Sequence, residues 1–456
     1  MSALIGDFHA SIGVARADIT PPLTARWKLW GAATDTTASG VHRPLTATAL
    51  AIISGDQRLL IVSLDVCEWT DPAAEHQVRE SIQQACGVGP DQLLLHSTHT
   101  HSAQAPCPVA AIPAERSLAD DHLELIRLRA TEAALAALAD AGEAVLSWGL
   151  GRSSLAVNRD QLLDGRAVVG YDPDLEADST VMVGRVSDTT GVRAILVSYA
   201  CHPTVLGWGN RLISPDYVGA LRAVVEEQYP QAIVCFLQGA SGELAPARQY
   251  RADAADADRA GRSLAHSVLA ALELMPPADH RLTFERVVES GAPLGVWTEQ
   301  PVAPRRDILV ERIDLRLPRR AEATIVGTDL PAHVMAERQA RAALVAQASA
   351  GAEDVLDYPV WLWQLGEAVI VAHPGEAYSW LASTLRAALS PRPVLVANLT
   401  NGAGAFYLPD RASYARGGYT VNQTPAGSGS LETLAETVLA HLGAPTQTNN
   451  PTPTRS

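Results

Sequence analysis

Leu93-Leu94-Leu95-His96-Ser97-Thr98-His99-Thr100-His101-Ser102 places three closely spaced histidines directly after an apolar run. The run predicts a buried strand, and in an extended chain the side chains of residues i and i+2 face the same side. We therefore expect His99 and His101 to point together beyond the strand's end. A polar loop with surface histidines is the alternative, but three histidines within six residues favour a metal or acid–base site.

Short apolar runs alternate with helical patterns along the chain. Apolar runs predict strands at residues 47–53, 59–64, 92–96, 144–148, 181–185, 194–199, 233–237, 308–315, 368–372 and 394–397. Apolar residues at i, i+3 and i+4 predict helices at residues 73–86, 119–141, 217–228, 254–274, 331–350, 376–389 and 430–442. This alternation predicts a mostly α/β domain built on one or more sheets.

Composition divides the chain into one domain and a tail. We expect the domain to span residues 1–442. Residues 443–456 are rich in Pro, Thr and Asn, which predicts a disordered tail. Within the domain, residues 276–306 are rich in Pro and Gly, so they indicate either a subdomain seam or an excursion over the active face.

Charge and apolar pattern exclude several classes of protein. The net charge is −15 without a basic cluster, which argues against a nucleic-acid partner and against an anionic membrane. No run of 18 or more apolar residues occurs, so we expect no transmembrane segment. Residues 1–10 lack the basic start and apolar core of a secretory signal, which predicts a cytoplasmic protein. Lys28 is the only lysine and no GxxxxGK[ST] or GxGxxG motif occurs, which favours metal or side-chain catalysis.

Three further predicted strands are followed by a possible metal ligand. His202, taken alone, is better explained as a buried core histidine with its hydrogen bonds made than as a metal ligand. Glu376 stands at a predicted helix start, where it could simply complement the helix dipole. Tyr407 ends a glycine-rich loop, and ordinary packing would also explain it. Together with His99, these residues place nitrogen and oxygen donors at four strand ends, which is how an open catalytic zinc site is assembled.

As an ordered set, several motifs resemble the N-terminal catalytic domain of neutral (non-lysosomal) ceramidases. The matching segments are Gly13-Val14-Ala15-Arg16-Ala17-Asp18-Ile19-Thr20-Pro21-Pro22, Thr98-His99-Thr100-His101-Ser102, His202-Pro203-Thr204, Ser214-Pro215-Asp216-Tyr217, Gln238-Gly239-Ala240-Ser241-Gly242-Glu243, Pro374-Gly375-Glu376 and Tyr407-Leu408-Pro409, with Tyr419 beyond. The resemblance runs from Ile12 to Leu442. It implies the fold of that domain, an α/β fold with mixed β-sheets flanked by helices.

The resemblance also implies a metal and its ligands. The family binds one zinc ion through two histidines, a glutamate and a tyrosine. Here these correspond to His99, His202, Glu376 and Tyr407. Phe406 is the competing alignment for the tyrosine, but a phenyl ring offers no donor atom to zinc.

The resemblance places His101 and Arg159 beside the scissile group, and Tyr419 is the third expected catalytic residue. The implied reaction is hydrolysis of a linear N-acyl amide in a small-molecule substrate. Zinc would activate a water molecule and polarise the carbonyl. His101 would carry the proton to the leaving amine, while Arg159 and Tyr419 would stabilise the oxyanion. Asp216 is either a residue that supports the ligands or an ordinary helix N-cap.

The chain departs from the family pattern in three places. The family segment Gly-Asp-Val-Ser-Pro reads Gly242-Glu243-Leu244-Ala245-Pro246, so Ala245 replaces a serine sometimes proposed as the nucleophile. We expect no counterpart of the family's C-terminal immunoglobulin-like domain beyond Leu442, and no secretory signal. These departures weaken ceramide as the substrate more than they weaken zinc-dependent hydrolysis.

Three other functions stay open. Ser241 could serve a serine hydrolase, although its segment lacks the final glycine of the G-x-S-x-G elbow. A zinc enzyme on this scaffold could also act as an esterase, a cyclase or a condensing enzyme, because a fold does not fix a reaction. The third function is a non-catalytic, metal-stabilised binding protein. Against it, a structural zinc is more often closed by four Cys or His ligands.

Overall fold

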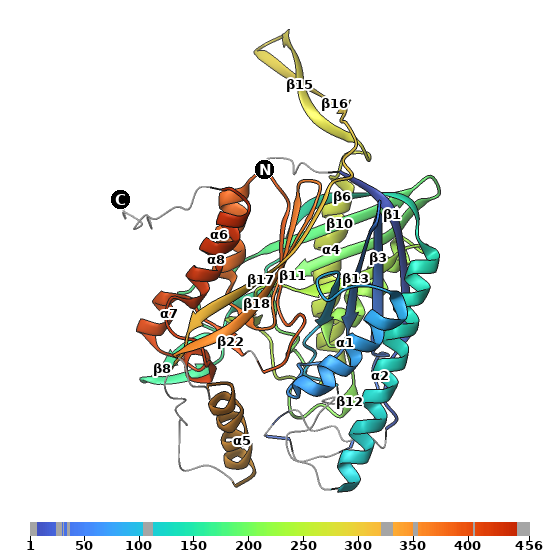
Figure 1. The fold of residues 1–456 in the computed structure, drawn as a ribbon. Helices are drawn as coiled ribbons and strands as arrows, with labels where there is room; N and C mark the ends of the chain where they lie inside the picture. Colours follow the sequence, from blue (N-terminus) through green and yellow to red (C-terminus); the bar gives the residue numbers. More distant parts are fainter. Residues whose placement is uncertain are drawn as a thin grey trace.

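Two β-sheets stack face to face, and helices cover both outer faces, in a computed structural model of the protein (Figure 1). The structure describes residues 7–23, 30, 32–33, 37–103, 113–320, 332–349, 354–404 and 406–444. The predicted tail lies outside the described residues from residue 445 onward. The layers are therefore helix, sheet, sheet and helix, and the predicted α/β fold with mixed sheets flanked by helices is confirmed.

The larger sheet has eight strands. In spatial order they are β13 (Ile233–Gln238), β11 (Gly191–Tyr199), β10 (Thr180–Asp188), β6 (Gly142–Arg152), β1 (Phe8–Asp18), β3 (Thr46–Ser54), β4 (Gln57–Leu64) and β5 (Leu93–Ser97). The β11–β13 and β4–β5 pairs at the two edges are parallel, and the pairs between them are antiparallel. Because of the parallel pairs, the chain leaves neighbouring edge strands at the same end of the sheet.

The second sheet has four strands, in the order β17 (Ile308–Pro318), β18 (Val355–Leu365), β19 (Ala368–Ala372) and β21 (Val394–Ala397). The β19–β21 pair is parallel. The remaining short strands are β2 (Gly40–Val41), β7 (Ala156–Asn158), β8 (Asp160–Leu163), β9 (Arg166–Val169), β12 (Leu212–Ile213), β14 (Leu244–Pro246), β15 (His280–Glu289), β16 (Pro293–Pro301), β20 (Glu376–Ala377) and β22 (Tyr407–Leu408).

The helices pack in groups on the outer faces. Against one half of the larger sheet lie α1 (Pro72–Cys86) and α2 (Pro113–Asp140), and against the other half lie α3 (Tyr217–Gln228) and α4 (Ala254–Glu273). The second sheet is covered by α6 (Ser379–Leu389) and α8 (Ser430–His441). The chain also forms α5 (Ala332–Ser349), α7 (Arg411–Arg416) and a 3₁₀ helix, η1 (Thr420–Gln423).

Side-chain size alternates along the central strands and fixes which face meets which layer. In β3, Leu50 and Ile52 join the core between the sheets, while Ala49 and Ala51 face the helix side. Small residues allow α2 to lie close to the sheet. At Gly13, an added Cβ would stand 2.1 Å from the carbonyl oxygen of Ala137 on α2. The period of two therefore sorts large side chains into the inter-sheet core and small ones under the helix.

Every predicted strand and helix has a counterpart, with most ends within a few residues. Four long strands, β1, β15, β16 and β18, were not predicted. The helix predicted from residue 376 begins at Ser379 because Glu376 pairs in β20. Residues 276–306 form neither a seam nor an excursion over the active face. They contain the hairpin β15–β16, which projects from the body (Figure 1). No described helix is long and apolar enough to cross a membrane.

A buried ion pair ties α3 to the end of β4. The Arg222 guanidinium donates two hydrogen bonds to the Asp65 carboxylate, at 2.6 and 2.9 Å, and both residues are buried. The same carboxylate accepts a hydrogen bond from the Thr98 hydroxyl at 3.1 Å. This contact connects the helix layer to the loop that carries His99.

Removing the Asp65 charge should destabilise the whole domain. In Asp65→Asn the Arg222 cation stays buried without its counter-ion, which typically costs about 3–5 kcal/mol. The matched control is Glu132→Gln on α2, which breaks the exposed Arg129–Glu132 pair and should cost no more than about 1 kcal/mol. Urea unfolding followed by circular dichroism measures both free energies. Equal losses in the two variants would contradict a stabilising role for the buried pair.

A carboxyl group caps α6 from a distant loop. Glu243 accepts hydrogen bonds from the Ser379 backbone N–H at 2.9 Å and from the Ser379 hydroxyl at 2.5 Å. Burial raises the pKa of Glu243 from 4.5 to about 8. The folded protein therefore keeps this carboxyl protonated over a pH range in which the unfolded chain ionises it.

Stability should fall as pH rises from about 4.5 to about 8, because only the unfolded state releases the Glu243 proton in this window. Glu243→Gln keeps a hydrogen-bond acceptor and removes the titrating group. The melting temperature of the variant minus that of the wild type should therefore increase between about pH 5 and about pH 8. Calorimetry at both pH values checks this, and a difference that stays constant would refute the assignment.

Candidate metal centre

Four separate segments bring the expected ligands to one end of the stacked sheets. The loop after β5 carries His99, and the loop after β11 carries His202. Beyond β19, Glu376 starts the short strand β20, which pairs in parallel with β22 so that Glu376 stands directly beside Tyr407. The structure therefore brings all four expected ligands into one region.

The backbone at His99 is not extended. Its φ is +69°, in the left-handed region that residues with a side chain seldom adopt. The argument that His99 and His101 face the same side as residues of an extended strand is therefore wrong, because β5 ends at Ser97. The turned chain nevertheless brings the two rings together, with 3.3 Å between their Nε2 atoms.

Backbone carbonyls orient both histidine ligands. His99 Nδ1 donates to the Cys67 carbonyl at 2.8 Å, and His202 Nδ1 donates to the carbonyls of Ser241 at 2.9 Å and Leu244 at 3.0 Å. Because a carbonyl only accepts, the proton of a neutral ring sits on Nδ1. Burial, followed by the charge of Arg159, lowers the pKa of His202 to about 3, so this ring is neutral with its Nε2 lone pair free.

The Nε2 atoms of both rings converge on a buried carboxylate. Glu376 Oε2 lies 2.9 Å from His202 Nε2 and 3.3 Å from His99 Nε2. Burial would raise the pKa of Glu376, but the charge of His99 and the contacts of both imidazoles hold it well below its usual range, so the group is an anion. Burial would lower the pKa of His99, but Glu376 raises it well above its usual range, so this ring carries a proton on Nε2 until a cation takes its place. Glu376 Oε1 is buried and has no hydrogen-bond partner among the described residues.

The donor set fits a divalent cation. The ligand atoms of His99, His202 and Glu376 all lie within 4.8 Å of one another, and all three side chains are buried. The His202 Nε2 lone pair faces a carboxylate oxygen, an arrangement that a cation between them stabilises. Two imidazole nitrogens and one carboxylate are a usual protein ligand set for zinc, with a further position left open.

Tyr407 contacts the guanidinium group of Arg159. Its hydroxyl accepts a hydrogen bond from Arg159 Nη2 at 3.2 Å, and its ring is buried. Phe406, the competing residue, has a φ of +49° and turns its ring towards Arg341, whose Cζ is 5.9 Å from the ring centroid. The two neighbours therefore face different partners, and Tyr407 is the one beside Glu376 and Arg159.

The three expected catalytic residues lie around this centre. Arg159 is buried and donates to the Gly242 carbonyl at 2.8 and 3.2 Å. The Tyr419 ring stands 6.0 Å from the Tyr407 ring, measured between centroids. The His101 ring packs 5.2 Å from the Trp30 ring. His101, Arg159 and Tyr419 are thus brought together with the expected ligands.

Sequence reasoning missed two groups near the site. Cys67 follows β4, the parallel neighbour of β5, and forms a second possible metal-binding group with His99 and His101. Parallel edge strands ending together would have indicated it. Arg341 comes from α5, where it lies 3.6 Å from Glu68, and the helical pattern gave no signal for it.

Three residues that sequence reasoning weighed have other surroundings. The Ser241 hydroxyl is buried and accepts a hydrogen bond from the Gln238 amide at 2.6 Å. Ala245 is buried in β14. Asp216 caps α3, accepting from the backbone N–H of Tyr217 at 2.7 Å and of Leu206 at 2.9 Å. Asp216 therefore acts as the N-cap, which was the ordinary alternative.

Known proteins resemble this chain in sequence and in fold. Residues 11–249, more than half of the chain, match the profile of the family described as neutral/alkaline non-lysosomal ceramidase, N-terminal. Two solved structures, a ceramidase complexed with C2 and the neutral ceramidase from Pseudomonas aeruginosa, each align with a TM-score of 0.70 at 18% identity. Each alignment covers 98% of this chain and 77% of the other. The chain therefore belongs to the neutral/alkaline ceramidase family.

Proposed function

We propose that this protein is a zinc-dependent hydrolase that cleaves the amide bond of a linear N-acyl substrate. The observation that carries the proposal is the convergence of His99, His202 and Glu376, whose ligand atoms lie within 4.8 Å of one another. Membership of a ceramidase family supports hydrolysis of an amide bond. Tyr407, which pairs with Glu376 across β20 and β22, is the fourth proposed ligand.

The side chains around the centre have separate roles in the proposed reaction. Zinc held by His99, His202, Glu376 and Tyr407 would supply Lewis acidity for activating a water nucleophile and polarising the amide carbonyl. His101, beside His99, carries a proton to the leaving amine. Burial, followed by the charge of His99, lowers the pKa of His101 well below its usual range, so the ring starts neutral. Arg159 and Tyr419 stabilise negative charge on the carbonyl oxygen.

A substrate series tests the reaction itself. N-acyl amides of increasing chain length, the corresponding esters and a free acid with its amine would be incubated with the purified protein. Release of free amine from the amides supports the proposal. Turnover of the esters alone, or net synthesis from acid and amine, would instead support the esterase or condensation alternatives on the same scaffold.

Alanine variants of His99 and His101 should differ in how much zinc they bind. His99→Ala and His202→Ala each remove a proposed ligand, so purified protein should lose zinc and activity together. His101→Ala should keep close to one zinc per chain and lose on the order of 10²–10⁴-fold in kcat, as expected for a general acid–base group. Elemental analysis and single-substrate kinetics measure the two effects.

The alternative group of Cys67, His99 and His101 provides the matching control. If that group held the ion, Cys67→Ser and His101→Ala would empty the site while His202→Ala retained the metal. Full zinc content in all four variants would show that the ion lies elsewhere and that the carry-over of ligands from the family fails.

Ser241→Ala should leave most of the activity. The Ser241 hydroxyl is held by Gln238, and no hydrogen bond to an imidazole is found for it among the described residues. Kinetics with the same N-acyl amide, together with mass spectrometry of the protein during turnover, measure the outcome. An acyl group trapped on Ser241, and loss of turnover in a normally folded variant, would support the serine mechanism instead.

A further inference from the structure

The hairpin β15–β16 exposes an unusual amount of apolar side chain. It projects away from the stacked sheets, and neither strand pairs with any other described strand (Figure 1). Six large apolar residues of the hairpin are 40–57% exposed: Leu282, Phe284, Val287, Val288, Leu294 and Trp297. Monomeric proteins seldom leave such a concentration of apolar surface in water, so the hairpin calls for a partner.

The apolar residues occupy both faces of the hairpin. Phe284 stands opposite Trp297, with 5.7 Å between the ring centroids, and Val288 stands opposite Leu294. Trp297 and Leu294 are three residues apart in one strand, so their side chains point to opposite faces. An isolated two-stranded hairpin is marginally stable in water, and neither face packs on the sheets of its own chain.

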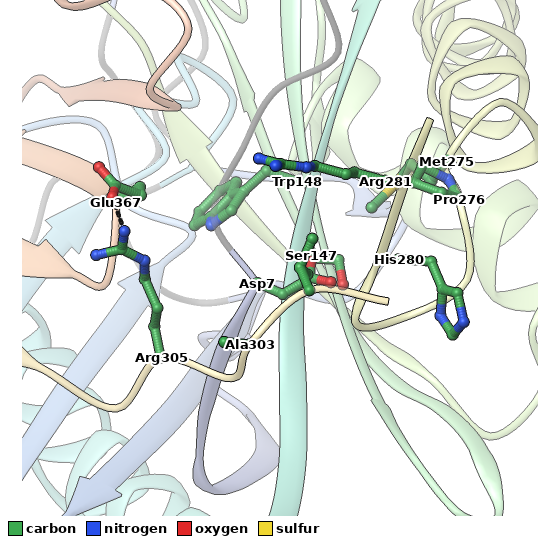
Figure 2. Close-up of a pocket in the computed structure, with 11 residues that line it drawn as sticks. Asp7, Ser147, Trp148, Met275, Pro276, His280, Arg281, Ala303, Arg305 and Glu367 are labelled. Atoms are coloured by element: carbon green, nitrogen blue, oxygen red, sulfur yellow. Dashed lines mark ion pairs between the residues drawn. The ribbon is translucent and has the colours of Figure 1, made fainter. Parts of the chain in front are cut away.

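The root of the hairpin is held firmly. His9 Nε2 bonds to Asp279 Oδ1 at 2.5 Å, and the Val302 N–H donates to the Asp279 carbonyl at 2.7 Å. In the segment between β16 and β17, the Arg305 carbonyl accepts a hydrogen bond from the His9 N–H at 2.7 Å. Arg305 also pairs with Glu367 across a cavity at the root (Figure 2). These contacts fix the hairpin in direction, which lowers the entropy lost on association.

The hairpin lies far from the metal centre. Glu367, beside its root, precedes β19, whereas Glu376 follows the other end of that strand. Five strand residues between them span roughly 17 Å at about 3.3 Å each. The apolar residues of the hairpin are therefore not part of the substrate site.

The charges of the hairpin and of the whole chain favour a second copy of this chain over a membrane as the partner. The hairpin carries Arg281, Arg286, Glu285, Glu289 and Glu299, which nearly balance, in a chain of net charge −15. An anionic membrane would repel the chain, and Glu289 at the tip opposes insertion into lipid. A two-fold contact between identical chains brings the same patch together twice, and a patch of nearly balanced charge does not repel its own copy as the acidic remainder of the chain would.

We propose that the hairpin is a dimerisation arm that packs against the same arm of a second copy of this chain. Phe284 and Trp297 form the centre of the contact, because large aromatic side chains contribute most to such interfaces. The outer edges of β15 and β16 offer unpaired backbone groups that extend the contact by strand pairing. The proposal stands independently of the reaction catalysed at the metal centre.

Sedimentation velocity of the full-length protein over a range of concentrations tests the arm. The wild type should be a dimer in the low micromolar range. The double variant Phe284→Ala/Trp297→Ala should raise the dimer dissociation constant by at least about tenfold. Leu128→Ala, which removes a side chain 52% exposed on α2, is the matched control and should leave dissociation unchanged.

A second variant guards against local misfolding of the arm. His280 and Pro301 face each other at the root, so residues 281–300 can be replaced by a two-residue turn. This variant should be monomeric, with the melting temperature and zinc content of the wild type. The proposal is overturned if the wild type is monomeric at high concentration or if the shortened variant remains a dimer. Binding of the monomeric wild type to phosphatidylcholine vesicles, lost in the shortened variant, would overturn it in favour of a lipid surface.

Discussion

The buried carboxylate of Glu376 between two imidazoles is the contact on which the site depends. An ionised carboxylate in a protein interior costs several kcal/mol unless other groups compensate it. Part of the compensation comes from His99, because the Glu376 carboxylate raises the pKa of this ring well above its usual range although burial would lower it. Both rings are held by backbone carbonyls at Nδ1, so when they are neutral, as metal ligands must be, each Nε2 lone pair is aimed at the anion. Three electron-rich atoms facing one another in the interior are stable around a cation, and this constraint accounts for the geometry of the whole centre.

The two stacked sheets make this convergence possible. The ligands lie far apart in sequence, but the parallel pairs at the sheet edges release their loops at the same end. His96, the first histidine of the motif, fastens the layers together. Its Nε2 accepts from the Gln238 N–H at 2.8 Å, so its Nδ1 carries the proton and donates to the Thr400 hydroxyl at 3.0 Å. One histidine of three is therefore a satisfied core residue, and the other two lie at the centre.

Much of the fold could be predicted because local and global signals agree. Long apolar runs such as β13 and β19 appear at their predicted positions. The strand β1 was missed because its Ala, Gly and Ser residues fit under α2 and give a weak apolar signal. Residues 276–306 were misread because the Pro and Gly residues at the ends of the hairpin hid the alternation inside its strands.

The site was predictable as a set of residue types but not as a geometry. Donors after predicted strands indicated which side chains converge, whereas the reason given for pairing His99 with His101 failed because His99 adopts a positive φ. Sequence spacing cannot reveal such a turn, since the hydrogen bonds that hold it, from the N–H of Thr98 to Leu64 and of His99 to Val66, come from the neighbouring strand.

The same limit applies to Arg341, whose helix meets the site only through tertiary packing.

The two ends of the stacked sheets differ in which residues they bury and which they expose. Charged groups are buried where the ligands meet, and apolar groups are exposed where the hairpin leaves the body. Each departs from the usual distribution of residues in a globular protein. The proposed metal would explain the first, and the proposed second copy of the chain would explain the other. Since the two features lie at opposite ends of β19, the proposed contact between two arms does not involve the residues of the metal centre.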